Sequence, residues 1–143
     1  MSEKLINVLL VEDDDVDRIN VKRAFQRNNI RNPLYMAHNG LEALEMLRSH
    51  GEIQPVVPWE RRLILLDLNM PKMNGLEFLQ ELRNDPLLMS TPVIILTTSD
   101  EDRDRVEAYQ FNIAGYILKP VIFTKFADMI GTLNKYWTLC EMP

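Results

Sequence analysis

The most informative segment of this chain is Leu63-Ile64-Leu65-Leu66-Asp67-Leu68-Asn69-Met70-Pro71. Its aliphatic residues are followed directly by a carboxylate, and Pro71 prevents regular structure from continuing. A short apolar run bounded by turn residues is typical of a fully buried strand in a parallel sheet. Asp67 is therefore expected at the carboxyl end of a strand, where open α/β sheets bind ligands. A single acid at that position could also cap a helix or lie in a solvated loop, so its meaning depends on its neighbours.

The composition of the chain indicates one globular domain. The 143 residues can bury a substantial core, and 46% hydrophobic with 26% charged residues is typical of a folded protein. No apolar run reaches the roughly 20 residues that a transmembrane helix needs, and residues 1–4 do not resemble the start of a signal peptide. A single cysteine excludes an internal disulfide and favours a cytoplasmic location. The net charge of −5 argues against nucleic acid as a direct partner.

Short apolar segments and amphipathic segments alternate along the whole chain. Besides residues 63–66, strands are expected at 6–11, 34–37, 93–96 and 115–118. A helical pattern follows each strand, and the one at about 100–110 is so charged that only Val106, Ala108 and Tyr109 are expected to be buried. Strict alternation predicts an α/β fold, a doubly wound parallel sheet with right-handed crossovers and helices on both faces.

Polar residues end most of the predicted strands. They are Glu12 and Asp13 after the first strand, Asp67 after the third, Thr97 after the fourth and Lys119 after the fifth. The carboxyl ends of parallel strands share one edge of the sheet, so these side chains are expected to converge there.

Such a group of side chains fits phosphoryl transfer to an aspartate. Three carboxylates close together repel one another unless they are protonated or bridged by a cation. Oxygen ligands with room for water suit Mg²⁺, while a lysine and a threonine hydroxyl can bind phosphate oxygens. Positioning and charge neutralisation carry most of the catalysis in phosphoryl transfer. Taken singly, Asp13 could be a helix cap, Lys119 a surface charge and Thr97 a strand-end hydroxyl.

The sequence resembles the receiver domains of bacterial two-component response regulators over residues 5–135. The resemblance is carried by residues 10–14 (LVEDD), 65–75 (LLDLNMPKMNG), 95–98 (ILTT) and 115–120 (GYILKP). It implies a flavodoxin-like fold of five β–α units with strand order 2-1-3-4-5. A single receiver domain is then expected over 1–143, with an apolar tail at 136–143.

The resemblance also implies the roles of individual residues. Asp67 would accept a phosphoryl group from the phosphohistidine of a histidine kinase. Asp13 and Asp67 would bind Mg²⁺ through their side chains and Asn69 through its backbone carbonyl. Glu12, which stands where the family has a second Asp, would act through metal-bound water. No other enzymatic activity is expected beyond the domain's own phosphorylation and dephosphorylation.

A second set of residues is implied in switching. Lys119 would pair with the phosphoryl oxygens, and its bond to Pro120 is expected to be cis. Thr97 would move to hydrogen-bond the phosphoryl group, and Tyr116 would swing inward behind it. This change would shift the population between two states of the domain.

The sequence resembles the stand-alone regulators that partner cyanobacterial phytochrome kinases. The shared features are the residues of the motifs, the long connection at 50–62 and the Tyr136-Trp137 ending. A bacterial phytochrome is therefore the expected histidine kinase partner. Since the chain ends soon after the last helix, no output domain is expected, and the signal is expected to pass through contacts with an unknown target protein.

The last predicted helix, at about 122–137, carries an unusually wide apolar face. A homodimer is expected through the residues Phe123, Ile130, Leu133, Tyr136 and Trp137. The alternative is that the apolar tail at 138–142 folds back and buries this helix more deeply.

Three other functions are less consistent with the sequence. A phosphohydrolase of the haloacid dehalogenase type would have an acid two residues after the nucleophile, where this chain has Asn69. A flavodoxin-like electron carrier would need a Ser/Thr/Gly-rich phosphate loop after the first strand. A pseudo-receiver that takes no phosphate would not need all the polar strand-end residues. His38 and His50, without a cysteine nearby, are expected at the surface rather than on a metal.

Overall fold

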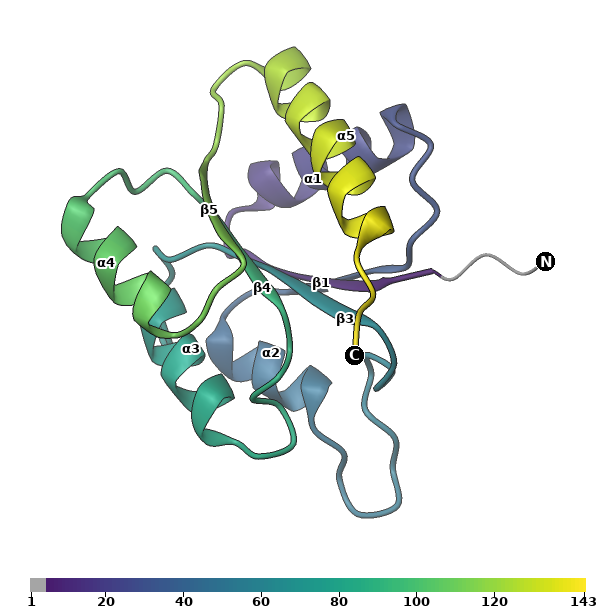
Figure 1. Cartoon of the computed structure of the whole chain (residues 1–143), viewed down its shortest axis with the longest axis vertical. Helices are drawn as coiled ribbons and strands as arrows, with labels where there is room; N and C mark the ends of the chain where they lie inside the picture. The colour runs from purple at the N-terminus through teal and green to yellow at the C-terminus, as the bar shows by residue number, and fades with distance from the viewer. Residues whose placement is uncertain (1–4) are drawn as a thin grey trace.

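The computed structural model describes residues 5–143, which form a five-stranded parallel sheet flanked by helices on both faces (Figure 1). The strand order is β2-β1-β3-β4-β5. The predicted flavodoxin-like fold is therefore confirmed. The strands are β1 (Asn7–Val11), β2 (Leu34–Ala37), β3 (Arg62–Leu66), β4 (Val93–Thr97) and β5 (Gly115–Leu118). The helices are α1 (Asp15–Arg27), α2 (Gly40–Leu47), α3 (Gly75–Asn84), α4 (Asp102–Gln110) and α5 (Phe123–Leu139).

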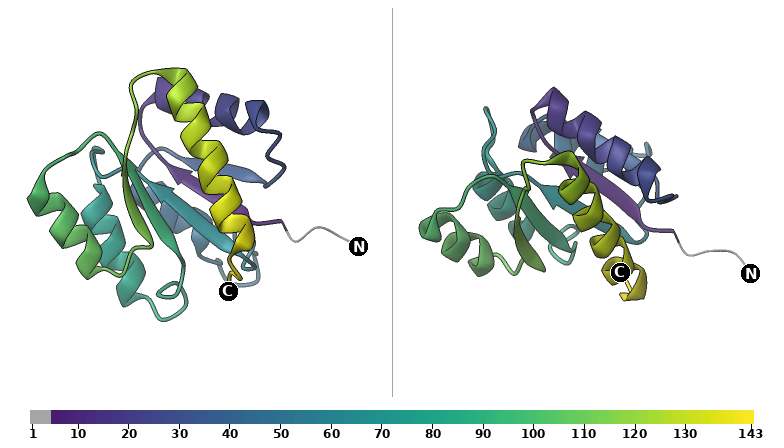
Figure 2. Two further views of the ribbon diagram at one scale, coloured as in Figure 1. Left: turned by 45° about the horizontal axis from the view of Figure 1, so that its top comes forward. Right: turned by 90° about the horizontal axis from the view of Figure 1, so that it is seen from above.

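The apolar strands build two cores, one on each face of the sheet. Successive side chains of a strand point to opposite faces, so Ile64 and Leu66 of β3 enter one core and Leu63 and Leu65 the other. Figures 1 and 2 show α1 and α5 side by side over one face, with α2, α3 and α4 over the other. The central strand β3 and its neighbour β4 are buried at every residue. The carboxyl end of β3 is thereby fixed from both sides.

Side-chain caps fix where the first three helices begin. The Asp14 carboxylate accepts a hydrogen bond from the Asp17 backbone N–H at 2.9 Å, at the start of α1. Asn39 caps α2 in the same way. At α3, Asn74 and Glu77 form a reciprocal capping box. These caps place the first turns of the helices beside the carboxyl ends of the strands.

The structure corrects the dimer residues that the sequence predicts on α5. Ile130 and Trp137 have no exposed surface, and the Trp137 ring lies 6.1 Å from that of Phe25. These two residues belong to the core of the domain, so their assignment to a dimer interface is wrong. They are buried because α5 packs against α1 as well as against the sheet. Phe123 lies half-buried beneath the Arg23 guanidinium, 4.1 Å from its ring centroid.

The end of the chain follows the alternative interpretation and folds back onto the domain. The backbone N–H of Arg61 donates to the Pro143 carbonyl at 2.8 Å, and Met142 packs against the core under α5. Among the dimer candidates, Tyr136 remains exposed and Leu133 half-buried. The dimer itself stays a prediction, with a smaller set of residues to support it.

The long connection between α2 and β3 is tied down by Arg62. The buried guanidinium donates to the carbonyls of Leu47, Val57 and Pro58 at 2.7–2.8 Å, and it stacks on the Trp59 ring at 4.2 Å. This connection is therefore fixed against the domain although it has no regular structure. None of the helices within residues 5–143 has the length and apolarity needed to cross a bilayer.

Candidate functional site

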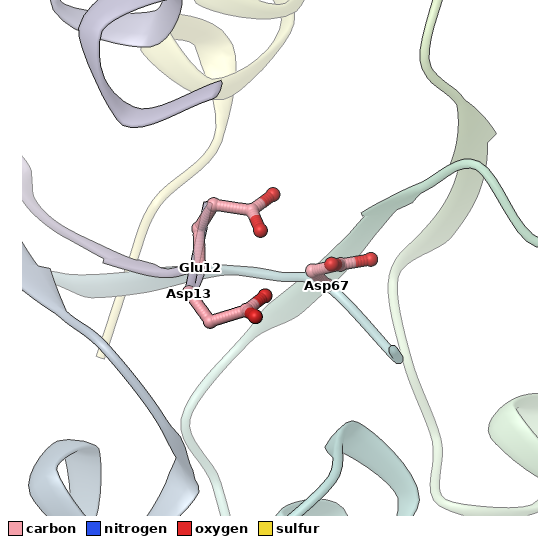
Figure 3. A group of neighbouring side chains, drawn as sticks. All are labelled: Glu12, Asp13 and Asp67. Carbon is pink, nitrogen blue, oxygen red and sulfur yellow. The ribbon is translucent and has the colours of Figure 1, made fainter. Parts of the chain in front are cut away.

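Three acids meet at the carboxyl end of the sheet, as the sequence predicts. Glu12, Asp13 and Asp67 each contribute a carboxylate oxygen to a group in which all these atoms lie within 4.8 Å of one another. Figure 3 shows Asp13 and Glu12 reaching from the end of β1 toward Asp67 at the end of β3. The Asp67 backbone N–H donates to the Val11 carbonyl at 3.0 Å, which holds the two strand ends together.

The acids differ in burial, and one of their oxygens lacks a partner. Glu12 and Asp67 are buried, with 1% and 6% of their surface exposed, whereas Asp13 is exposed. The Asp67 Oδ1 atom is buried and has no hydrogen-bond partner among residues 5–143. Buried polar atoms without a partner are uncommon and indicate a missing ion, water or reactant. The carboxylate oxygens fit a hard divalent cation such as Mg²⁺.

Lys119 balances the negative charge from the end of β5. Its Nζ contacts the Glu12 carboxylate and lies 3.0 Å from Asp17 Oδ2 and 4.0 Å from Asp67 Oδ2. Burial alone would lower the pKa of Lys119, but the nearby carboxylates of Asp67 and Glu12 raise it above its ordinary value. Burial raises the pKa of Glu12 to about 7, against the opposing effect of Lys119. Lys119 therefore remains a fixed positive charge beside Asp67.

The two predicted switch residues are both hydrogen-bonded to Ser99. Thr97, fully buried at the end of β4, accepts a hydrogen bond on its hydroxyl oxygen from the Ser99 N–H at 3.2 Å. The Tyr116 hydroxyl donates to the Ser99 carbonyl at 2.8 Å. A movement of Thr97 would thus be transmitted to Tyr116 through Ser99, which lies in the β4–α4 loop.

The predictions for Asn69 and for the Lys119–Pro120 peptide bond have different outcomes. Asn69 is exposed in the loop beyond Asp67, and the role of its carbonyl stays a prediction. The Lys119–Pro120 bond is trans, which corrects the cis bond that the sequence predicts. A trans bond is the more stable isomer for an X–Pro pair by about 0.5–1 kcal/mol.

Sequence reasoning missed two residues of this site, Asp17 and Ser99. Asp17 is an acid in the first turn of α1, the helix that follows β1 at the same edge of the sheet as the site. That position could have suggested a further acid near the site. Ser99 has no comparable signal, because its role depends on the path of its loop.

Comparison with known proteins assigns the chain to a family. The profile of the response regulator receiver domain matches residues 8–131. The chain belongs to the receiver domain family of response regulators.

Individual relatives resemble the chain over nearly its whole length. The probable methanogenesis regulatory protein FilR2 of Methanothrix harundinacea is 33% identical over 91% of this chain and 82% of its own. The response regulator Rcp1 of Synechocystis is 32% identical over 91% of this chain and 87% of its own.

Solved structures agree with this assignment. The phosphorylated cyanobacterial phytochrome response regulator RcpA has a TM-score of 0.87 and 29% identity, covering 98% of this chain and 99% of its own. The Mn²⁺-bound form of Rcp1 has a TM-score of 0.83 and 31% identity, covering 96% of this chain and 99% of its own. Receiver domains bind Mg²⁺ or Mn²⁺ in an acidic pocket, and the cluster of Glu12, Asp13 and Asp67 fits such a pocket.

Proposed function

We propose that this chain is a phosphorylated response regulator. Asp67 accepts a phosphoryl group from the phosphohistidine of a histidine kinase in a reaction that depends on Mg²⁺. The observation that carries the proposal is the buried, unpartnered Oδ1 of Asp67. The Asp67 carboxylate lies among two further acids, and its other oxygen, Oδ2, is 4.0 Å from the Lys119 ammonium.

The transfer is a displacement at phosphorus. A carboxylate oxygen of Asp67 forms a bond to the phosphorus atom while the bond from phosphorus to the histidine nitrogen breaks. The electron pair of the broken bond stays on the imidazole, and Asp67 becomes an acyl phosphate. Asp67 is suited to this reaction because Val11 fixes its backbone and its side chain is shielded from bulk water.

Four residues would hold the metal. Asp13 and Asp67 would bind it through their carboxylates and Asn69 through its carbonyl, while Glu12 would act through metal-bound water. A bound Mg²⁺ supplies positive charge for the phosphoryl oxygens during transfer. The proximity of the three carboxylate oxygens supports this assignment, because such a group is unfavourable without a cation.

Lys119 and Thr97 would recognise the phosphoryl group once it is attached. The Lys119 ammonium would pair with one phosphoryl oxygen. Thr97 would exchange its hydrogen bond from the Ser99 N–H for one to another oxygen. Ser99 would lose its hydrogen bond to Thr97 and could shift. Because the Tyr116 hydroxyl donates to the Ser99 carbonyl, that shift would weaken the Tyr116 hydrogen bond and let its ring move inward. The signal would leave through protein contacts at the surface that this movement alters.

The similarity to RcpA and Rcp1 suggests the partner. RcpA is described as a cyanobacterial phytochrome response regulator, and we propose a kinase of the bacterial phytochrome type for this chain as well. The single cysteine fits action in the reducing cytoplasm, where we place the reaction.

The proposal is tested by intact mass after incubation with Mg²⁺ and acetyl phosphate. The wild type is expected to gain one phosphoryl group, and both Asp67→Asn and the wild type with a chelator are expected to gain none. Asp100→Asn, which alters an exposed acid outside the cluster, serves as the matched control and is expected to behave as the wild type. Failure of the folded wild type to gain mass, or gain by Asp67→Asn, would contradict the proposal.

The kinase assignment has its own test. A phosphorylated bacterial phytochrome is expected to transfer its phosphoryl group to this chain faster than kinases with unrelated sensor domains. Equal rates from all of them would remove the phytochrome assignment and leave phosphorylation of Asp67 in place.

A further inference from the structure

Lys119 is drawn away from Asp67 by an acid of α1 that the proposed reaction does not use. Its Nζ lies 3.0 Å from Asp17 Oδ2, which is a hydrogen bond, but 4.0 Å from Asp67 Oδ2, which is beyond one. The Glu12 carboxylate takes a second donor of the ammonium. Glu12 and Asp17 thus occupy two of the three donors of the Lys119 ammonium and hold it at hydrogen-bond distance from α1 rather than from Asp67.

Of the two partners of Lys119, Asp17 loses less free energy than Glu12 when the contact breaks. The Asp17 side chain is 38% exposed, so water can solvate its carboxylate after Lys119 leaves. The Glu12 side chain is only 2% exposed, and losing Lys119 would leave a buried carboxylate without a cation. The contact between Lys119 and Asp17 is thus expected to break and that with Glu12 to persist.

The surroundings of Asp17 fix its position beside Lys119 and leave room next to the pair. The Asp17 N–H is bonded to the Asp14 cap, so the helix begins at a fixed point and presents Asp17 to Lys119. A cavity of about 270 Å³ opens beside the pair, lined by Val16, Asp17, Lys119 and other residues. Both side chains therefore have space to move apart.

We propose, on the basis of the function proposed above, that Asp17 is a positioning residue that restrains Lys119 in the unphosphorylated protein. The contact stabilises the free site and competes with a bound phosphoryl group for Lys119. Asp17 therefore lowers the affinity of the site for a phosphoryl group.

The test uses beryllofluoride, a stable analogue of the phosphoryl group, with the whole chain in saturating Mg²⁺. Its dissociation constant is measured by calorimetry for the wild type, Asp17→Asn and Asp15→Asn. Asp15 is the matched control because it lies in the same turn of α1 and is paired with Arg18 instead of Lys119. We expect Asp17→Asn to bind about threefold to fivefold more tightly, the size of a partly exposed ion pair. Asp15→Asn is expected to change the dissociation constant by less than about twofold.

A double-mutant cycle shows whether Asp17 acts through Lys119. In the Lys119→Met background, Asp17→Asn is expected to leave the dissociation constant unchanged. A general loss of negative charge or a change in helix structure would tighten or weaken binding in both backgrounds alike. The cycle thus separates positioning of Lys119 from an effect of α1 alone.

The outcomes are distinguishable. If the wild type binds beryllofluoride and Asp17→Asn binds no more tightly than Asp15→Asn, the inference about Asp17 is overturned and the proposed function stands. An equal gain in the Lys119→Met background would overturn the inference in the same way. If the folded wild type binds no beryllofluoride, the proposed function fails and the inference fails with it.

Discussion

Gly75, the first residue of α3, lies directly against the backbone of Asp67. A methyl group on Gly75 would come 2.6 Å from the Asp67 carbonyl oxygen and 2.7 Å from the Cα of Leu68. The Gly75 N–H also donates to the Leu68 carbonyl at 3.0 Å. The position of the proposed phosphoacceptor thus depends on a glycine eight residues further along the chain.

Gly75→Ala is expected to damage both stability and the site. The added methyl group would push the end of β3 away from α3 and destabilise the fold by about 1–3 kcal/mol. It would also slow phosphorylation from acetyl phosphate, because Asp67 would move relative to Lys119. Urea unfolding and the rate of mass gain measure the two effects.

Gly115→Ala is the control for this substitution, since nothing lies within 4 Å of a methyl group at that position. It is expected to leave the phosphorylation rate unchanged. Equal effects of the two alanine substitutions would show that the contact between Gly75 and Asp67 does not matter.

Asp67→Asn is expected to stabilise the metal-free protein. The substitution removes one of three adjacent carboxylates and a buried charged atom without a partner. The gain should be about 1–4 kcal/mol, the size of one repulsion between unit charges about 4 Å apart, because the amide removes the charge but keeps a polar atom at the same position. Thermal unfolding in a chelator measures it. Mg²⁺ should raise the midpoint of the wild type and not of the variant. A less stable variant, or one that Mg²⁺ stabilises equally, would contradict the assigned site.

Arg62→Met is expected to destabilise the domain. It removes the donors to three carbonyls, at the end of α2 and in the connection before β3, while keeping most of the side-chain volume. The free energy of unfolding should fall by about 2–4 kcal/mol, since buried carbonyls lose their partners. Arg103→Met, at a side chain that is 85% exposed, is the control and should change it by less than about 0.5 kcal/mol. Comparable losses in both variants would show that Arg62 does not anchor the connection.

Alanine substitutions at Trp137 and Tyr136, which are neighbours on α5, are expected to change the free energy of unfolding by very different amounts. Trp137→Ala should cost about 3–5 kcal/mol, because the ring is fully buried. Tyr136→Ala should change the free energy of unfolding by less than about 1 kcal/mol, because its side chain is half exposed. Chemical denaturation checks both values. A small loss in Trp137→Ala would return that residue to the candidate interface.

The dimer prediction now depends on the exposed side of α5. If two copies associate there, Tyr136→Arg should shift sedimentation toward the monomer without a loss of stability. A wild type that sediments as a monomer at micromolar concentration, with and without phosphorylation, would remove the dimer.

The sequence predicts the strands and the acidic site well because both depend on local order. The predicted acids and the predicted lysine lie at or just after the end of an apolar strand, as Asp67 follows Leu66, and parallel strands bring such ends to one edge. Neither prediction requires knowledge of how a distant side chain is oriented.

The features that the sequence does not predict depend on tertiary packing. Val106 and Tyr109 of α4 are 60% and 50% exposed, and Ala108 is the buried residue of that helix. The burial of Trp137 reflects the packing of α5 on α1, and the contact of Asp17 with Lys119 joins residues from opposite ends of the chain. An apolar pattern shows which residues can be buried, and the packing of the helices decides which of them are.

Locating the modified residue shows whether Asp67 is the phosphoacceptor. After reaction with acetyl phosphate and Mg²⁺, borohydride reduces an aspartyl phosphate to homoserine, which peptide mass spectrometry can place in the sequence. We expect homoserine at position 67 in the wild type and at no position in a chelator or in Asp67→Asn. Homoserine at Asp13 or another acid, or none in a protein that has gained phosphoryl mass, would contradict it.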